Sequence, residues 1–226
     1  MNFDEFVLAA STATLSDEPD ARPVADAVEY RMDLATNPRS ALRDYDGELP
    51  LIATNRVHWE GGEAADDAAR LDALCEAAEH DAVCAVDIEL EAIESGNGER
   101  VVAAAREAET TVIVSMHDFE ATPPIAELRH LLKTASDHGD VAKLACTATS
   151  LDDVLDVLFA TRTFDANGRA VATMAMGEVG RHSRVVAPLY GSRIGYAPIK
   201  PEDATAPGQY DLETMRLLVD KLDSND

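Results

Sequence analysis

Short apolar runs alternate with longer amphipathic stretches along the chain, and this alternation limits the possible folds more than any other feature. Eight runs rich in Val, Ile and Ala have the length and composition of buried strands. They are FVLAAS (6–11), DAVEYRMD (26–33), LPLIATNR (49–56), AVCAVDIEL (82–90), TTVIVSMHD (110–118), VAKLACTA (141–148), AVATMAMG (170–177) and SRIGYAPI (192–199). Apolar strands separated by helices are typical of a parallel sheet that helices cover.

Several of the stretches between these runs have the period of an amphipathic helix. Ser150, followed by Asp152 and Asp153, is a helix start signal, and so is Thr122 before two prolines. The predicted helices cover 66–81, 122–139, 149–164 and 211–222, and in the last of them Leu212, Met215, Leu218, Val219 and Leu222 share one face.

Eight strand–helix units in 226 residues suit a closed barrel. Each unit has about 28 residues, which fits the small end of the (β/α)₈ TIM barrel range. We therefore predict a single α/β domain over residues 1–226. An open, doubly wound sheet is the alternative, but GxGxxG is missing, and neither Gly61-Gly62 nor SGNG at 95–98 supplies it.

The charge is strongly negative and spread along the whole chain. Asp and Glu number 43 against 19 Lys and Arg, which gives a formal net charge of −24. Nucleic acid and anionic membranes would repel such a protein, so we expect neither as a partner. An acidic surface with few lysines indicates a source that lives in high salt, because salt screens the self-repulsion. Unfolding in low-salt buffer is the test of this hypothesis.

The cysteines and the amino terminus indicate a cytoplasmic protein. Cys75, Cys84 and Cys146 form no CxxC pair and no metal-binding spacing, which favours a reducing compartment. The segment MNFDEFVLAAST carries acids where a signal peptide carries basic residues, and no apolar run approaches the ~20 residues needed to span a bilayer.

Polar residues collect where the predicted strands end, which is where barrel enzymes place their chemistry. Alternation along 26–33 puts Glu29, Arg31 and Asp33 on one face of the strand and Tyr30 and Met32 on the other. The other candidates are Arg56, Glu60, His117, Lys143, Met174, Met176, Arg181, Arg184, Thr205 and Gln209. Structural ion pairs, core methionines and a loop histidine would explain each of them singly.

Lys143 stands alone among small and apolar residues in VAKLACTA. One interpretation is a lysine whose amine reaches out to solvent. The other is a nucleophile, because desolvation and nearby arginines lower the pKa of a lysine and free its amine to form a Schiff base with a carbonyl substrate.

Five ordered motifs resemble those of the type I 3-dehydroquinate dehydratases. They are EYRMD (29–33), VSMHDF (114–119), AKLA (142–145), MGEVGRHSR (176–184) and APGQ (206–209). The resemblance implies a homodimeric (β/α)₈ barrel, and the acidic composition indicates a halophilic archaeon as its source. It also implies a lyase of the shikimate pathway of aromatic amino acid biosynthesis, which dehydrates 3-dehydroquinate to 3-dehydroshikimate without metal or cofactor.

The resemblance also implies roles for individual residues. Lys143 would form the imine with the substrate C3 ketone, and His117 would move a proton from C2 to the departing C1 hydroxyl. Glu60 would hold and polarise His117, and Arg184 would bind the substrate carboxylate. The remaining substrate-binding positions are Glu29, Arg31, Arg56, Thr205, Gln209, Met176 and Ser11. Thr205 stands where many relatives have serine.

Two other functions remain open at this point. A class I aldolase or transaldolase also uses a strand lysine in a barrel, although no glycine-rich phosphate loop is evident here. A barrel that only binds an acid metabolite is the non-enzymatic alternative. The loop over 199–209 has the Gly and Pro content of a lid.

Overall fold

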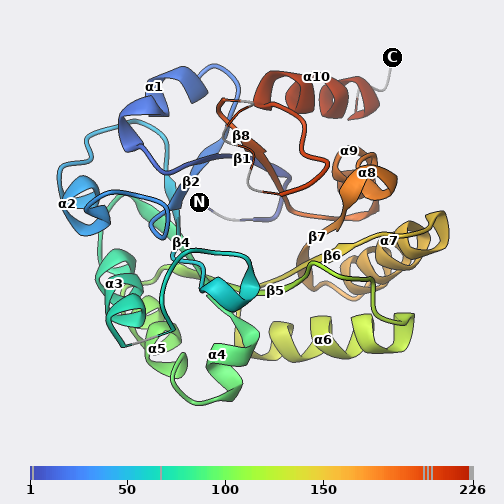
Figure 1. Ribbon diagram of the computed structural model, residues 1–226, viewed down its shortest axis with the longest axis horizontal. Helices are drawn as coiled ribbons and strands as arrows, with labels where there is room; N and C mark the ends of the chain where they lie inside the picture. Colours follow the sequence, from blue (N-terminus) through green and yellow to red (C-terminus); the bar gives the residue numbers. More distant parts are fainter. Residues whose placement is uncertain (2, 67, 201, 203, 205, 224–226) are drawn as a thin grey trace.

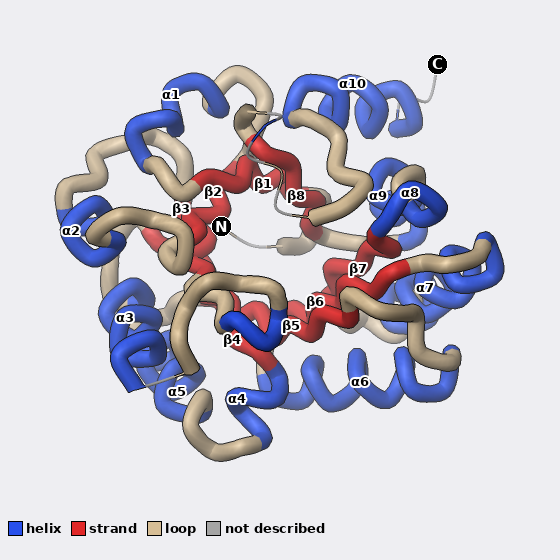
Figure 2. The backbone as a smooth tube through the Cα atoms, viewed as in Figure 1, coloured by secondary structure: helices blue, strands red, loops and turns tan. Residues whose placement is uncertain are grey.

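Eight parallel strands form one sheet that curls into a barrel (Figures 1 and 2). The computed structural model describes residues 1, 3–66, 68–200, 202, 204 and 206–223. The strands are β1 (Val7–Thr12), β2 (Ala27–Arg31), β3 (Leu51–Thr54), β4 (Val83–Glu89), β5 (Thr111–Asp118), β6 (Val141–Thr147), β7 (Ala170–Met176) and β8 (Ile194–Pro198). All eight predicted strands are present, with ends that differ by at most two residues.

The strand order decides between the two predicted architectures. The sheet runs β7-β6-β5-β4-β3-β2-β1-β8, so each strand lies beside its sequence neighbour and β1 also pairs with β8. An isolated parallel bridge between Val171 and Ser192 joins β7 to the segment before β8, and Arg193 N donates to Val171 O at 2.7 Å. The predicted (β/α)₈ barrel is confirmed as a nearly closed barrel, and the open doubly wound sheet is wrong.

Helices surround the ring of strands in Figure 1. The four predicted helices are α3 (Ala68–Ala78), α6 (Ile125–His138), α7 (Leu151–Asp165) and α10 (Leu212–Asp223). Ser150 caps α7, because its hydroxyl accepts from Asp153 N while the Asp153 carboxylate accepts from Ser150 N.

The remaining described helical segments are shorter and did not stand out in the sequence. They are η1 (Leu15–Asp17), α1 (Glu18–Ala21), α2 (Pro38–Arg43), η2 (His58–Glu60), α4 (Leu90–Glu94), α5 (Glu99–Glu107), α8 (Gly177–Gly180), α9 (Ser183–Val186) and η3 (Ala187–Tyr190). No helix among the described residues combines the length and the apolar character that crossing a membrane requires.

Alternation along each strand separates an inner from an outer core. On β2, Tyr30 points outward and packs, with Met32 just beyond the strand, in the core between sheet and helices, while Glu29 and Arg31 line the interior. The interior nearer the amino ends of the strands is apolar and includes Ile52, Ile113 and Ile194. The polar residues therefore lie nearer the carboxyl ends of the strands, at one mouth of the barrel.

Candidate active site

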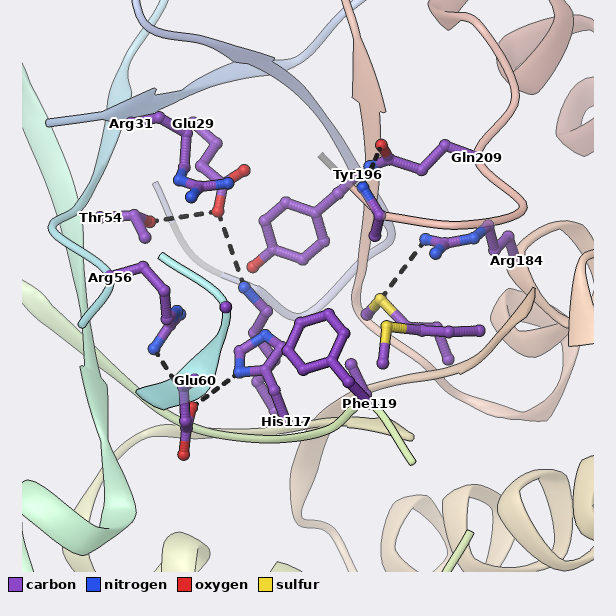
Figure 3. A pocket seen from close by; sticks show the side chains of 16 residues that line it. Glu29, Arg31, Thr54, Arg56, Glu60, His117, Phe119, Arg184, Tyr196 and Gln209 are labelled. Carbon is purple, nitrogen blue, oxygen red and sulfur yellow. Dashed lines mark hydrogen bonds and ion pairs between the residues drawn. The ribbon is translucent and has the colours of Figure 1, made fainter. Parts of the chain in front are cut away.

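A cavity at the carboxyl ends of the strands brings the predicted site residues together (Figure 3). It holds about 510 Å³ of empty space, including the space at its open mouth. Nine of the eleven predicted site residues line it: Glu29, Arg31, Arg56, Glu60, His117, Lys143, Met176, Arg184 and Gln209. Ser11 does not line this cavity, and Thr205 lies outside the described residues.

Lys143 lies in the middle of β6 and points into the barrel. Its side chain is only 5% exposed, so the amine does not reach out to solvent. Nζ lies 2.9 Å from Asp87 Oδ2 and 3.6 Å from Glu29 Oε1, and 4.0 Å from the centre of the Tyr196 ring. Two carboxylates thus lie against the amine, a contact that the sequence did not predict.

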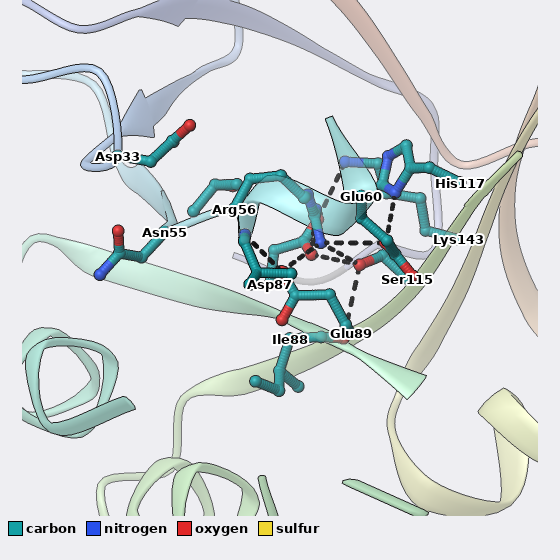
Figure 4. Close-up of polar contacts among 12 residues, drawn as sticks. Asp33, Asn55, Arg56, Glu60, Asp87, Ile88, Glu89, Ser115, His117 and Lys143 are labelled. Carbon is teal, nitrogen blue, oxygen red and sulfur yellow. Dashed lines mark hydrogen bonds and ion pairs between the residues drawn. The ribbon is translucent and has the colours of Figure 1, made fainter. Parts of the chain in front are cut away.

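Arg56 is the centre of a buried charge network beneath the cavity (Figure 4). Its guanidinium donates to Asp87 at 2.6 Å, to Glu89 at 2.9 Å and to Ser115 Oγ at 2.7 Å. Burial opposes ionisation of Asp87, but Arg56, Lys143 and the Ser115 hydroxyl together hold the pKa of this carboxyl far below its ordinary value. Asp87 is therefore an anion that fixes both cations.

His117 and Glu60 form a hydrogen-bonded pair, with Nδ1 and Oε2 2.8 Å apart. The turn of η2 presents Glu60 to His117, and Gly61 ends that turn with a φ of 76°, a conformation that favours glycine. Burial raises the pKa of Glu60 to about 8, against the opposing effect of Arg56. Burial and the charges of Arg56 and Lys143 lower the pKa of His117 well below its ordinary value.

Arg184 lies on the opposite side of the cavity from Glu29 and Arg31 (Figure 3). It is 5% exposed, and burial lowers its pKa to about 10. Its guanidinium donates to Pro207 O at 3.2 Å and contacts Met174 Sδ at 3.6 Å, its Nε has no partner, and no carboxylate among the described residues pairs with it. A buried cation with only neutral partners is suited to bind an anionic ligand.

The segment around Pro207 packs onto the start of α8. Pro207 O accepts from Gly177 N at 3.2 Å as well as from Arg184, and Gln209 Oε1 accepts from Ala206 N at 3.1 Å. Gly208 has a φ of 76°, and a Cβ there would meet the Gly177 carbonyl. The described part of this loop thus covers Arg184.

Ser11 supports the site from behind. Its hydroxyl donates to Glu29 Oε2 at 2.6 Å, and Thr54 Oγ1 donates to Glu29 Oε1 at 3.1 Å. The structure therefore places Ser11 behind Glu29, and its role as a substrate contact stays a prediction.

Sequence reasoning did not single out Asp87, Glu89, Thr54, Ser115 or Tyr196. One signal could have revealed the first two, because D-I-E alternates inside the apolar strand AVCAVDIEL as E-Y-R does in EYRMD. The other three are uncharged and look like ordinary strand residues.

Fold and site together define a class of protein. The chain is a (β/α)₈-barrel protein whose mouth holds a buried lysine, a histidine–carboxylate pair and a buried arginine open to an anion. These groups are suited to imine chemistry on a carbonyl substrate that carries negative charge.

Comparisons with known proteins agree with this class. A sequence model of the type I 3-dehydroquinase family matches residues 7–226. A 3-dehydroquinate dehydratase of Haloarcula marismortui is 57% identical over 228 residues, which cover 100% of both chains. The crystal structure of 3-dehydroquinate dehydratase from Geobacillus kaustophilus has a TM-score of 0.87 at 26% identity, covering 98% of this chain and 93% of that one.

A further solved structure matches closely. The type I 3-dehydroquinate dehydratase of Clostridium difficile, crystallised with covalently modified comenic acid, has a TM-score of 0.84 at 26% identity and covers 96% of this chain and 92% of that one. The chain belongs to the type I 3-dehydroquinase family. Its activity is accordingly that of a Schiff-base hydro-lyase of the shikimate pathway, not of an aldolase or a binding protein.

Proposed function

We propose that Lys143 is the residue that forms the Schiff base with the C3 ketone of 3-dehydroquinate. The observation that carries this proposal is the position of its buried amine, which projects into the cavity between Asp87 and Glu29. Asp87 also binds Arg56 through its other oxygen, so the amine is held by a carboxylate that is itself fixed.

We assign proton transfer to His117. The protonated imine withdraws electrons and acidifies the C2 proton, which His117 removes before it protonates the departing C1 hydroxyl. Glu60 holds Nδ1, which leaves Nε2 as the nitrogen for the substrate. One residue then acts at both ends of the elimination, which fits a cavity with a single histidine among its described lining residues.

The other predicted residues bind the substrate in this proposal. Arg184 takes the carboxylate, and Met176 forms an apolar wall beside the ring. The hydroxyl-binding groups are Glu29, Arg31, Arg56 and Gln209, with Ser11 and Thr205 as additional contacts. Arg56 already donates hydrogen bonds to Asp87, Glu89 and Ser115. It therefore contributes to substrate binding mainly through its fixed positive charge.

Chemical trapping tests the assignment of Lys143. The enzyme is incubated in high salt with 3-dehydroquinate and borohydride, which reduces an imine to a stable amine, and the intact and peptide masses are measured. We expect one covalent adduct, on the peptide that contains Lys143. An adduct on Lys133, Lys200 or Lys221, or turnover without any adduct, would contradict the assignment.

In the wild type, kcat/KM is expected to increase as the pH rises through about 8, the pKa of Glu60. Below that pH Glu60 is protonated and donates to Nδ1, so Nε2 carries the imidazole proton and cannot accept another. Above it the carboxylate accepts the Nδ1 proton and Nε2 becomes a base. The apparent value belongs to the His117–Glu60 pair as a unit.

Glu60→Gln is expected to remove this rising limb, because glutamine does not titrate. Glu63→Gln, at an exposed position three residues later, is the matched control and should keep the wild-type profile. An unchanged profile in Glu60→Gln would show that another group controls the limb.

We also propose that the enzyme is a homodimer that pairs through α7. Leu151, Leu155 and Phe159 lie on successive turns of this helix and are 66%, 62% and 56% exposed. The neighbouring η3 adds the exposed Leu189 and Tyr190. Five exposed apolar side chains on two neighbouring elements of a chain of charge −24 support an interface with a second copy, since two such chains repel elsewhere.

Leu155→Glu is expected to convert the dimer to a monomer, because it places a charge in the centre of this interface. Leu217→Glu on α10 is the control, since Leu217 is 57% exposed and lies outside the α7 surface. Sedimentation velocity in high salt measures both. A wild-type monomer, or a Leu155→Glu dimer as tight as the control, would contradict the proposal.

A cytoplasmic location completes the proposed function. The three cysteines of the chain are free, two of them partly exposed, which supports a reducing compartment.

A further inference from the structure

Tyr196 is a buried residue of the cavity wall to which neither the sequence nor the proposed mechanism assigns a task. It lies in the middle of β8 and is 5% exposed. Its ring packs against the Lys143 amine, with Nζ 4.0 Å from the ring centre. In Figure 3 the ring reaches into the cavity, and its hydroxyl lies on the side of Glu29, away from Arg184.

The hydroxyl of Tyr196 has no hydrogen-bond partner among the described residues. The neighbouring side-chain hydroxyls are all bonded: Thr54 in the wall and Ser11 behind it donate to Glu29, and Ser115 beneath the cavity donates to Asp87. A buried hydroxyl without a partner is unfavourable, and phenylalanine would supply the same ring without that cost. The hydroxyl therefore points to a partner that enters the cavity.

The position of the hydroxyl beside the amine indicates which substrate atom it meets. The nucleophile must approach C3 to bonding distance, so the C3 oxygen arrives within a few ångströms of Nζ. Asp87 and Glu29, which lie against the amine, are acceptors when ionised and cannot stabilise negative charge on that oxygen. A phenol can, because its O–H is a donor.

We propose that the Tyr196 hydroxyl donates a hydrogen bond to the ketone oxygen of the substrate while Lys143 attacks C3. This proposal rests on the assignment of Lys143 made above. The ammonium first gives one proton to a carboxylate beside it, which later passes it to the departing oxygen. The freed lone pair forms the C–N bond, and the π pair of the C=O bond moves onto oxygen, where the tyrosine hydroxyl meets the developing charge.

The atoms balance without any further reactant. Ketone and ammonium together give a protonated imine and water, so the two protons that leave with the oxygen are those that the nitrogen gives up. Tyr196 gains and loses none. Burial, together with the charges of Asp87 and Glu29, raises the pKa of this phenol well above its ordinary value, which keeps it a neutral donor throughout.

Tyr196→Phe tests the proposal, because it removes the hydroxyl and keeps the ring. The enzyme is mixed with 3-dehydroquinate, quenched with borohydride at timed intervals, and the adduct is measured by mass. We expect adduct formation at saturating substrate to slow by about 10- to 100-fold, the effect of losing one hydrogen bond to a charged group. The melting temperature of the ligand-free variant should not fall, since no hydrogen bond within the described residues is lost.

Tyr30→Phe is the matched control. It removes another buried tyrosine hydroxyl, but one that donates to Pro38 O at 3.2 Å on the outer side of β2. This variant should lose thermal stability and keep the wild-type rate of adduct formation.

Two results would overturn the proposal. One is adduct formation at the wild-type rate in Tyr196→Phe. The other is a raised KM in this variant with an unchanged rate at saturating substrate, which would mean that the hydroxyl binds a different group of the substrate. Trapping of the wild type on a lysine other than Lys143 would overturn the assignment of Lys143 and this proposal together. Wild-type trapping on Lys143 with a full rate in Tyr196→Phe would overturn this proposal alone.

Discussion

Lys143→Ala is expected to lose about 10⁴-fold or more in turnover while it keeps part of its affinity for 3-dehydroquinate. The substitution removes the group that forms the covalent bond, and without it the C2 proton has no electron sink. Arg184 and the polar wall at Glu29 and Arg31 remain, so binding is only partly lost. Steady-state kinetics and calorimetric binding in high salt measure the two effects separately.

Lys133→Ala is the control for this experiment. Lys133 lies exposed on α6 and pairs with Asp137, so its loss should leave both turnover and affinity unchanged. Full activity in Lys143→Ala would show that dehydration here proceeds without an imine at this residue.

His117→Ala is expected to form the imine and then stall. The amine and its carboxylate partners are untouched, so borohydride should still trap an adduct on Lys143. Turnover should fall by about 10²- to 10⁴-fold, because proton transfer from C2 and to the C1 hydroxyl loses its general acid and base. His130→Ala, at an exposed position on α6, should behave as the wild type.

Unimpaired turnover in His117→Ala would remove this residue from the mechanism. Loss of the adduct as well as of turnover would mean that His117 is already required for imine formation. The mass of the borohydride-treated protein and the turnover rate distinguish the two results. The melting temperature shows whether the variant is folded.

The fold was largely predictable because each strand is apolar and each long helix is amphipathic. The eight runs require burial on both faces, and this local pattern is enough to indicate β/α alternation. The short helices α8 and α9 were not evident, since four-residue turns have no periodicity to detect. Closure between β7 and β8 rests on an isolated bridge near Ser192, a contact that no local pattern encodes.

The site was predictable where family motifs name charged residues, and less so where partners come from distant strands. The structure brings Glu29, His117 and Lys143 to one cavity as expected. That the amine pairs with Asp87 depends on the register of β4, β5 and β6, which sequence spacing alone does not specify. For the same reason the sequence could not indicate that the Tyr196 hydroxyl lacks a hydrogen-bond partner, because its neighbours lie on other strands.

The burial of the charges around Arg56 separates the chemistry of this enzyme from its surroundings. Surface carboxylates are screened by salt over about 3 Å at 1 M, whereas buried pairs are screened much less. Arg56, Asp87 and Glu89 are at most 4% exposed, so dissolved ions screen the charges around Lys143 much less than those on the surface. We therefore expect salt to change the fraction of molecules that are folded, and to change little the turnover rate of a folded molecule saturated with substrate.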